Sequence, residues 1–140
     1  MKKIVFVCLG NICRSPMAEF VMKSLTDQLK IESRATSSWE HGNPIHQGTQ
    51  AIFKKYAISY DRDKTSQQIS PADFADFDYI IGMDESNVRD LKRMAPEDFQ
   101  HKIYQFEEES VPDPWYTGDF DQTYDLVLAG CKKWLERLDG

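Results

Sequence analysis

The first thirty residues predict a buried strand, a short loop and a helix, in that order. Residues 3–8, KIVFVC, are mainly β-branched and aromatic, which is typical of a strand buried on both faces. The loop that follows contains Gly10 and Asn11, two residue types that tolerate left-handed backbone. Ser15 precedes a proline and is a good N-cap for a helix that we expect to run to about Lys30. Such a segment is typical of α/β proteins with a parallel sheet.

The rest of the chain continues the alternation of strands and helices. We expect strands near 34–38, 79–83 and 102–106, and helices over 48–56, after residue 71, over 85–94 with Asp84 as its cap, and over 120–138. No repeat, low-complexity tract or linker divides the 140 residues, a length that suits one domain. The prediction is a single α/β domain over 1–140, with a parallel sheet covered by helices on both faces.

The loop between the first strand and the first helix has the features of an anion-binding site. In an open α/β sheet, ligands bind at the carboxyl ends of the strands, and residues 8–15 lie there. A loop of this length at a helix N-terminus points backbone N–H groups inward. It matches neither GxxxxGK[ST] nor GxGxxG, so neither ATP nor dinucleotide binding is indicated. Instead Cys8 begins the loop and Arg14 ends it.

The pairing of this cysteine and arginine predicts a phosphate-transfer site. The helix N-terminus, the loop amides and Arg14 all favour a nucleophilic thiolate at Cys8. Arg14 would bind two phosphate oxygens with its planar fork, which lysine lacks. The Ser15 hydroxyl is placed to donate to the sulfur. The alternative is a buried strand-end cysteine and a surface arginine, but the surrounding loop and helix start favour catalysis.

Three segments then resemble one protein family. VCLGNICRSPMAE resembles the signature loop of the low-molecular-weight protein tyrosine phosphatases, FDYIIGMDESNVRDL resembles their third strand and next helix, and VPDPWY resembles their general-acid loop. The resemblance implies a four-stranded parallel sheet of the flavodoxin-like, phosphotyrosine phosphatase I type. It also implies hydrolysis of protein phosphotyrosine and small aryl phosphates through a cysteinyl-phosphate, without a metal or organic cofactor. In the loop it implies substrate binding by Leu9, Gly10, Asn11, Ile12, Cys13 and Ser15.

The general acid is predicted to be Asp113. Transfer of phosphate to the cysteine requires a proton for the departing phenolate and then a base for water. Asp113 lies between two prolines, and the second drives its backbone toward an extended conformation. An acidic turn ahead of a helix is the alternative, and the match to the family's acid loop favours the catalytic role.

Three aromatic residues are predicted to form the walls of the substrate slot. By resemblance, Trp39, Trp115 and Tyr116 accept a flat phosphorylated ring, although aromatic residues more often pack in cores. A deep slot would favour phosphotyrosine over the shorter phosphoserine.

Two features of the loop stay open at this point. By resemblance, Cys13 forms a reversible disulfide with Cys8 that protects the nucleophile from over-oxidation; a packing role is the alternative. Many family members brace the asparagine that corresponds to Asn11 with a histidine before the third strand. The segment DRDKTSQQIS contains no histidine, and Lys64 or Ser66 are the residues that we expect in its place.

The remaining cysteine and the histidines predict no metal site. His41, His46 and His101 lack metal-ligand spacing, and the two loop cysteines lack a second ligand pair. Each histidine is expected to be an ordinary surface residue, and Cys131 is expected in the core.

Charge and composition limit which partners the protein can bind and in which compartment we expect it. A formal net charge of −6 argues against nucleic-acid binding, and no stretch is long enough to span a bilayer. The apolar start resembles a signal peptide, but Asn11 and Arg14 interrupt it. Three cysteines without a disulfide pattern suggest a reducing compartment. We expect a soluble, cytoplasmic monomer that acts on tyrosine-phosphorylated proteins or peptides.

Three other functions are less consistent with the sequence. Arsenate reduction on this fold needs two further cysteines for a disulfide relay, and only Cys131 is present. Related protein arginine phosphatases carry threonine at the position of Ile12, and isoleucine favours the tyrosine branch. A phosphate-binding module without catalysis is disfavoured because Cys8, Arg14 and Asp113 are all present.

Overall fold

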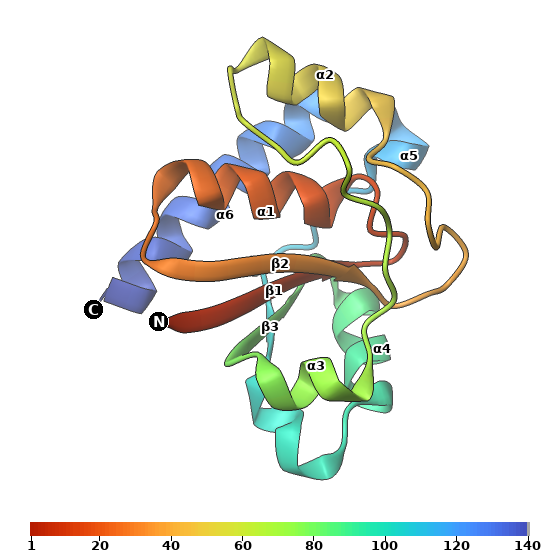
Figure 1. Cartoon of the computed structure of the whole chain (residues 1–140), viewed down its shortest axis with the longest axis vertical. Helices are drawn as coiled ribbons and strands as arrows, with labels where there is room; N and C mark the ends of the chain where they lie inside the picture. The colour runs from red at the N-terminus through yellow and green to blue at the C-terminus, as the bar shows by residue number, and fades with distance from the viewer. Residues whose placement is uncertain (140) are drawn as a thin grey trace.

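Four parallel strands form the centre of the protein (Figure 1). The computed structural model describes residues 1–139. The strands are β1 (Lys2–Cys8), β2 (Leu29–Ala35), β3 (Tyr79–Gly82) and β4 (Ile103–Gln105), in the order β2-β1-β3-β4. Each neighbouring pair is parallel. Because β1 lies between β2 and β3, the loop after it begins in the middle of the sheet.

Helices cover both faces of this sheet, as predicted. The helices are α1 (Arg14–Leu25), α2 (Gln47–Lys55), α3 (Pro71–Asp76), α4 (Glu85–Met94), α5 (Pro114–Thr117), α6 (Phe120–Asp139) and the 3-10 helix η1 (Glu97–Lys102). Figure 1 shows α1, α2 and α6 on one side of the sheet and α3 and α4 on the other. The predicted α/β fold with a four-stranded parallel sheet is confirmed.

The apolar run of β1 is explained by these two layers. Ile4, Phe6 and Cys8 belong to the core cluster beneath α1, α2 and α6, whereas Val5 and Val7 belong to the cluster beneath α3 and α4. Successive side chains of a strand point to opposite faces. A strand that is covered on both faces therefore has to be apolar at every position.

The first helix and the second strand differ from the prediction. α1 ends at Leu25 rather than near Lys30, and β2 covers Leu29–Ala35 rather than 34–38. Thr26 ends the helix with an extended backbone, and its hydroxyl accepts a hydrogen bond from the backbone N–H two residues on (3.1 Å). Such local side-chain bonds compete with helix. β2 is an edge strand in which charged residues alternate with apolar ones, so its sequence signal is weak.

Two further details of the helices were predicted incorrectly or not at all. Cys13, not Ser15, occupies the N-cap position of α1, and no side chain caps this helix. Ser15 is fully buried and its hydroxyl contacts Cys8 instead. The short helices η1 and α5 have six and four residues, which is too short for a periodic pattern. Asp84 caps α4 as predicted, by accepting a hydrogen bond from the backbone N–H of Asn87 (2.7 Å).

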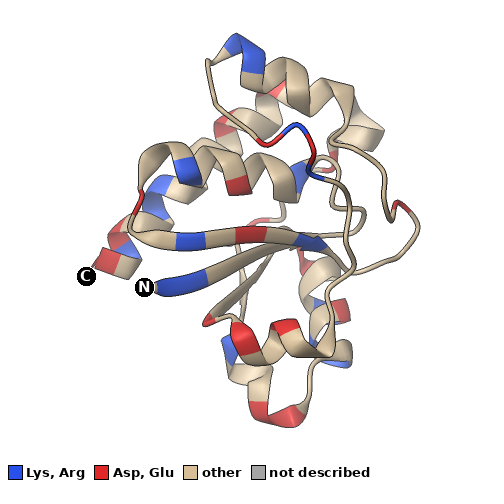
Figure 2. Cartoon of the chain, viewed as in Figure 1, with Lys and Arg blue, Asp and Glu red and all other residues tan. Residues whose placement is uncertain are grey.

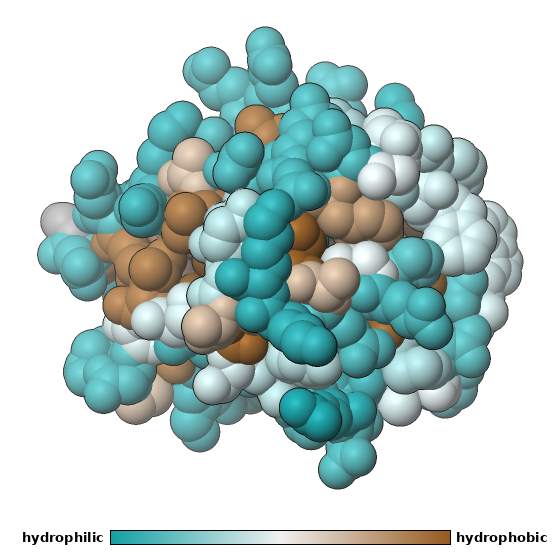
Figure 3. Space-filling view, turned by 90° about the horizontal axis from the view of Figure 1, so that it is seen from above, coloured by the Kyte–Doolittle hydropathy of each residue, from teal (hydrophilic) through white to brown (hydrophobic). Residues whose placement is uncertain are grey.

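Basic and acidic residues are both spread over the chain, and α1, β2, α4 and α6 each carry both kinds (Figure 2). Seen from above, hydrophilic side chains project furthest and hydrophobic ones show mainly between them (Figure 3). No helix within residues 1–139 has the length and apolar character needed to cross a bilayer.

Replacing Gly130 by alanine is expected to destabilise the protein by about 1–3 kcal/mol, although alanine is the better helix former. Gly130 lies in α6 against the buried ring of Phe106, and an added Cβ would come within 2.2 Å of that ring. Urea denaturation should show a lower midpoint at an unchanged slope. Ala129→Gly, at an exposed position of the same helix, is the control for helix propensity. An unchanged or higher midpoint for Gly130→Ala would contradict the packing argument.

Candidate active site

The loop between β1 and α1 wraps around the sulfur of Cys8. Cys8 is 3% exposed and ends β1 in the middle of the sheet. The backbone N–H of Asn11 donates to its Sγ (3.3 Å), and the Oγ of Ser15 lies 3.1 Å from it. Asn11 has a left-handed backbone, with φ 56°, which the sequence predicted as tolerable for asparagine. The loop thus places a hydroxyl and an amide against one buried sulfur.

Asn11 is braced by Ser33 of β2, which the sequence analysis missed. The Asn11 Nδ2 donates to Ser33 Oγ (2.9 Å) and to Ser15 Oγ (2.8 Å), and its Oδ1 accepts from the backbone N–H of Gln67 (3.1 Å). The expectation that Lys64 or Ser66 would contact Asn11 directly is wrong. The Ser66 hydroxyl instead donates to the carbonyl of Gly10 (2.7 Å).

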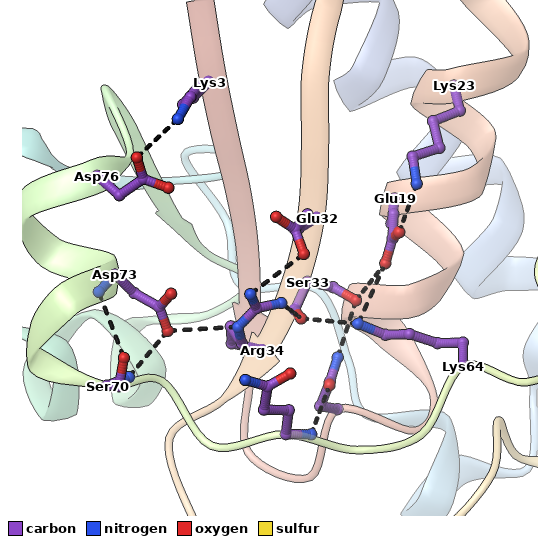
Figure 4. Close-up of polar contacts among 12 residues, drawn as sticks. Lys3, Glu19, Lys23, Glu32, Ser33, Arg34, Lys64, Ser70, Asp73 and Asp76 are labelled. Atoms are coloured by element: carbon purple, nitrogen blue, oxygen red, sulfur yellow. Dashed lines mark hydrogen bonds and ion pairs between the residues drawn. The ribbon is translucent and has the colours of Figure 1, made fainter.

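A buried ion pair stands behind Ser33 (Figure 4). The Ser33 hydroxyl donates to Glu19 Oε1 (2.6 Å), and Lys64 Nζ lies 3.5 Å from the same oxygen. Lys64 also donates to the carbonyl of Ser33 (2.9 Å). Burial lowers the pKa of Lys64, and the charge of Glu19 opposes that effect. Lys64 therefore supports Asn11 indirectly, through its contacts with Ser33 and Glu19.

The carboxylate of Glu19 fixes the direction of the hydrogen bonds that reach Cys8. An ionised carboxylate only accepts, so the hydrogen of Ser33 points to Glu19 and its oxygen is left to accept from Asn11. The second amide hydrogen of Asn11 goes to Ser15 Oγ. The Ser15 hydrogen can then point to Cys8 at 3.1 Å, with only the Arg34 carbonyl, at 3.4 Å, as a second acceptor. A donor aimed at the sulfur stabilises a thiolate.

Arg14 connects the loop to the segments that follow β3 and β4. Its Nη1 donates to Asp84 Oδ2 (2.7 Å) and to the carbonyl of Val111 (2.9 Å), and its Nη2 donates to Asp113 Oδ2 (3.4 Å). Burial alone would lower the pKa of Arg14, but the charges at Cys8, Asp84 and Asp113 raise it. Its Nε is a buried donor without a partner among residues 1–139. A buried, charged guanidinium with a free donor is suited to an oxyanion.

Asp113 lies at the start of α5 and faces Arg14. Its backbone is extended (φ −81°, ψ 114°), as the following proline predicts. Its Oδ1 accepts from the backbone N–H of Trp115 (3.0 Å), so the carboxylate caps its own helix. The Asp113 side chain is 22% exposed. A partly exposed carboxyl beside the buried sulfur site is able to exchange protons with water.

A cavity of about 140 Å³ joins these groups. Ten of the twelve predicted site residues line it: Cys8, Leu9, Gly10, Ile12, Cys13, Arg14, Trp39, Asp113, Trp115 and Tyr116. The other two, Asn11 and Ser15, lie beneath the loop and contact Cys8 instead. Trp39, Trp115 and Tyr116 are 78%, 57% and 77% exposed, so they stand at the mouth and not in the core.

Several residues of the site were not predicted as such. Ser37 and Glu40 also line the cavity, and Asp84 was predicted only as a helix cap. The chain contains many serines and acidic residues, so a single one gives no indication in the sequence that it belongs to the site. Asp84 lies two residues after the end of β3, which neighbours β1 in the sheet, and this position at a strand's carboxyl end is the signal that would have found it.

The predicted burial of the remaining cysteine and the predicted exposure of two histidines are confirmed, and that of the third histidine is not. Burial and the charge at Cys8 raise the pKa of the Cys13 thiol. Cys131 is fully buried, as predicted. His41 and His101 are exposed, as predicted, but His46 is half-buried and caps α2, so its prediction as an ordinary surface residue is wrong. Residues 1–139 contain no group of three or more His, Cys, Asp or Glu side chains placed to hold a metal ion.

Comparisons with known proteins agree with this geometry. The model of the low molecular weight phosphotyrosine protein phosphatase family matches residues 3–140. The chain is 45% identical to the low molecular weight protein-tyrosine-phosphatase PtpA of Staphylococcus aureus, over 94% of this chain and 90% of that protein.

Solved structures extend the comparison. SP-PTP, a low molecular weight protein tyrosine phosphatase from Streptococcus pyogenes, has a TM-score of 0.97 and 64% identity, covering 99% of this chain and 93% of that one. DARP, a Drosophila arginine phosphatase, has a TM-score of 0.89 and 31% identity, covering 100% of this chain and 99% of that one. With a family model that matches nearly every residue, this chain belongs to the low molecular weight phosphotyrosine protein phosphatase family.

Proposed function

We propose that the protein hydrolyses phosphotyrosine in proteins and peptides, and small aryl phosphates, with Cys8 as nucleophile, Arg14 as phosphate clamp and Asp113 as general acid and base. The observation that carries the proposal is the convergence on one cavity of a buried sulfur, a buried guanidinium and a partly exposed carboxyl. The three groups come from two loops that are almost one hundred residues apart. Arg14 contacts Asp113 directly and so joins them.

The first step transfers the phosphoryl group to sulfur. The Cys8 thiolate attacks phosphorus and forms the S–P bond while the P–O bond to the aryl group breaks. Asp113, in its acid form, gives its proton to the departing phenolate oxygen. Arg14 Nε, the loop amides and the N-terminus of α1 bind the three equatorial oxygens as charge spreads over them.

The second step releases phosphate. Asp113, now a carboxylate, takes a proton from water, and the water oxygen attacks phosphorus as the S–P bond breaks. The electron pair of that bond returns to Cys8 Sγ, and the Ser15 hydroxyl stabilises the thiolate from 3.1 Å. Asp113 regains its acid form, and the cycle can repeat.

The aromatic residues at the mouth supply selectivity for a ring. Trp39 comes from the loop after β2, and Trp115 and Tyr116 come from α5, so the cavity lies between rings on two sides. A phosphotyrosine side chain reaches the sulfur through such a slot with its ring against these walls. Phosphoserine is shorter and would leave the walls without a partner.

A protein arginine phosphatase is the second candidate, because DARP covers the whole chain at 31% identity. Ile12 lines the cavity. The related arginine phosphatases carry threonine at this position. An apolar side chain there offers no hydrogen bond to a guanidinium. Arsenate reduction is disfavoured further, because Cys131 is fully buried and cannot exchange disulfides.

Peptides of one sequence with phosphotyrosine, phosphoarginine or phosphoserine test the proposal most directly. We expect the highest kcat/KM for phosphotyrosine, inhibition by vanadate and no effect of EDTA. A preference for phosphoarginine would replace the tyrosine assignment by the second candidate. No turnover of any phosphomonoester under reducing conditions would overturn the enzymatic proposal. The Cys8–Cys13 disulfide, the monomeric state and the cytoplasmic location stay predictions.

Asp113→Ala is expected to slow poor leaving groups much more than good ones. Phenyl phosphate needs a proton on its departing oxygen, so we expect a loss of about 10²–10⁴-fold in kcat. 4-Nitrophenyl phosphate has a more stable anion and should lose far less in the first step. The measurement is the single-turnover rate constant for each of the two esters. Equal losses would show that Asp113 is not the acid.

A further inference from the structure

We propose that His46 is a positioning residue for the general acid, because its ring holds the helix that follows Asp113 against the phosphate loop. The inference rests on the proposed role of Asp113. It concerns a side chain outside the lining of the cavity, whose effect would be transmitted through Trp115. The phosphate loop and the chain around residues 115–120, which are distant in sequence, both contact this one residue.

The backbone and first turn after His46 are fixed to the phosphate loop. The backbone N–H of His46 donates to the carbonyl of Ile12 (2.9 Å). Three residues on, the buried Thr49 hydroxyl donates to the carbonyl of Cys13 (3.2 Å). The start of α2 is therefore attached to two successive carbonyls of the loop that surrounds Cys8.

The imidazole of His46 then contacts both helices that follow the acid. It lies nearly parallel to the ring of Phe120, with centroids 5.1 Å apart and planes at 19°. It meets the indole of Trp115 edge to face, at 5.6 Å and 81°. Phe120 begins α6 and Trp115 lies in α5, so one ring contacts the chain on both sides of residues 116–119. Aromatic pairs in these arrangements attract beyond their buried area.

Gly48 leaves the space that this packing needs. A Cβ at position 48 would lie 2.4 Å from the ring of Phe120. The ring of Phe120 therefore rests directly on the backbone of α2, between His46 and Thr49, the two residues that contact the phosphate loop. The distance from His46 to the loop and the distance from His46 to Phe120 are both set by close contacts.

The ring has a second bond that fixes its orientation. His46 Nδ1 accepts from the backbone N–H of Gly48 (2.9 Å) and caps α2. This bond holds Nδ1 toward the first turn of α2 and so sets the plane of the ring. The cap and the aromatic contacts are thus separate functions of one side chain, and different substitutions remove them separately.

The link to catalysis is the bond between Trp115 and Asp113. The backbone N–H of Trp115 donates to Asp113 Oδ1 (3.0 Å), while Asp113 Oδ2 faces Arg14. Movement of Trp115 therefore moves the carboxyl. A shift of about 1 Å is enough to lower a rate roughly 100-fold when it misplaces a catalytic group. Loss of the His46 ring should impair proton transfer more than attack by sulfur.

The test compares leaving groups in His46→Asn and His46→Ala. Asparagine keeps an acceptor for the Gly48 N–H and removes the ring, whereas alanine removes both. In single-turnover experiments, which report the first step, we expect both variants to react with 4-nitrophenyl phosphate within about 3-fold of the wild type, and to lose roughly 10-fold or more on phenyl phosphate. Both variants lose the ring contacts, and His46→Ala should lower the Tm further than His46→Asn through the lost cap. His101→Asn, at an exposed histidine, is the matched control and should change neither measurement.

A double variant identifies the residue through which His46 acts. In an Asp113→Ala background, His46→Asn should cause no further loss that depends on the leaving group. An equal loss on both esters in the single variants, or a full extra loss in the double variant, would reduce His46 to a structural residue and overturn the inference. If the wild type itself shows no turnover, the proposed function fails and this inference fails with it. Wild-type turnover with an unchanged leaving-group profile in His46→Asn would overturn the inference alone.

Discussion

Cys8→Ser is expected to lower the hydrolysis of aryl phosphates by about 10⁴-fold or more, because it removes the atom that forms the covalent intermediate. A serine hydroxyl at position 8 is far less ionised than a thiol and has no base placed to activate it. The Ser15 hydroxyl lies against this atom, but a neutral hydroxyl is far too weak a base to take the proton of a serine at position 8. The measurement is kcat with 4-nitrophenyl phosphate under reducing conditions.

The loss should occur without loss of the fold. The serine oxygen is smaller than sulfur and keeps partners in Ser15 and in the backbone N–H of Asn11. We expect a Tm close to that of the wild type and continued binding of phosphate, since Arg14 and the loop amides remain. Cys131→Ala is the matched control: it removes a buried cysteine far from the cavity, so it should lower stability and keep turnover. Turnover retained by Cys8→Ser would remove Cys8 from the role of nucleophile.

Arg14→Lys is expected to lower kcat by about 10²–10³-fold, the usual cost of removing one donor that stabilises a transition state. Lysine keeps the positive charge and loses the planar fork that joins Asp84, Val111 and Asp113. A single ammonium cannot satisfy these acceptors and also bind two phosphate oxygens. The affinity for phosphate or vanadate should fall as well.

An exposed arginine provides the comparison for this variant. Arg137 is exposed near the end of α6 and does not line the cavity, and Arg137→Lys should leave kcat unchanged. The Tm of Arg14→Lys should also be measured, because Asp84 and Asp113 lose part of their pairing. A rate for Arg14→Lys within a few-fold of the wild type would mean that charge alone, and not the guanidinium fork, is what this position contributes.

The parts of the site that lie along one short segment could be predicted from the sequence. β1, the loop of residues 8–15 and the start of α1 follow each other, so their geometry depends on local rules for buried strands, loops and helix ends. Asp113 was found in the same way, because its two neighbouring prolines limit its backbone. The sheet could be predicted because continuous apolar runs mark the two central strands.

The contacts that cross the sheet could not be predicted. Ser33 braces Asn11 from a strand 22 residues away, and Asp84 pairs with Arg14 from 70 residues away. In the sequence, a serine on an edge strand that faces a site cannot be distinguished from one that does not. The same is true of an acidic residue at the start of a helix. The same reason explains His46, whose contacts depend on where α5 and α6 lie. β2 itself was misplaced because its charged residues conceal its apolar face.

The support behind Asn11 has a consequence for how the rate should depend on pH. Lys64 belongs to a residue type that titrates ~4 pH units above histidine, so burial can lower its pKa and still leave it charged in mildly acidic solution. A histidine in that place would change its charge in or near the range where a carboxylic acid delivers protons. In this protein Lys64, and not a histidine, stands behind Ser33 and Asn11. The acidic side of a rate profile should then contain no step from the charge change of a histidine behind the phosphate loop.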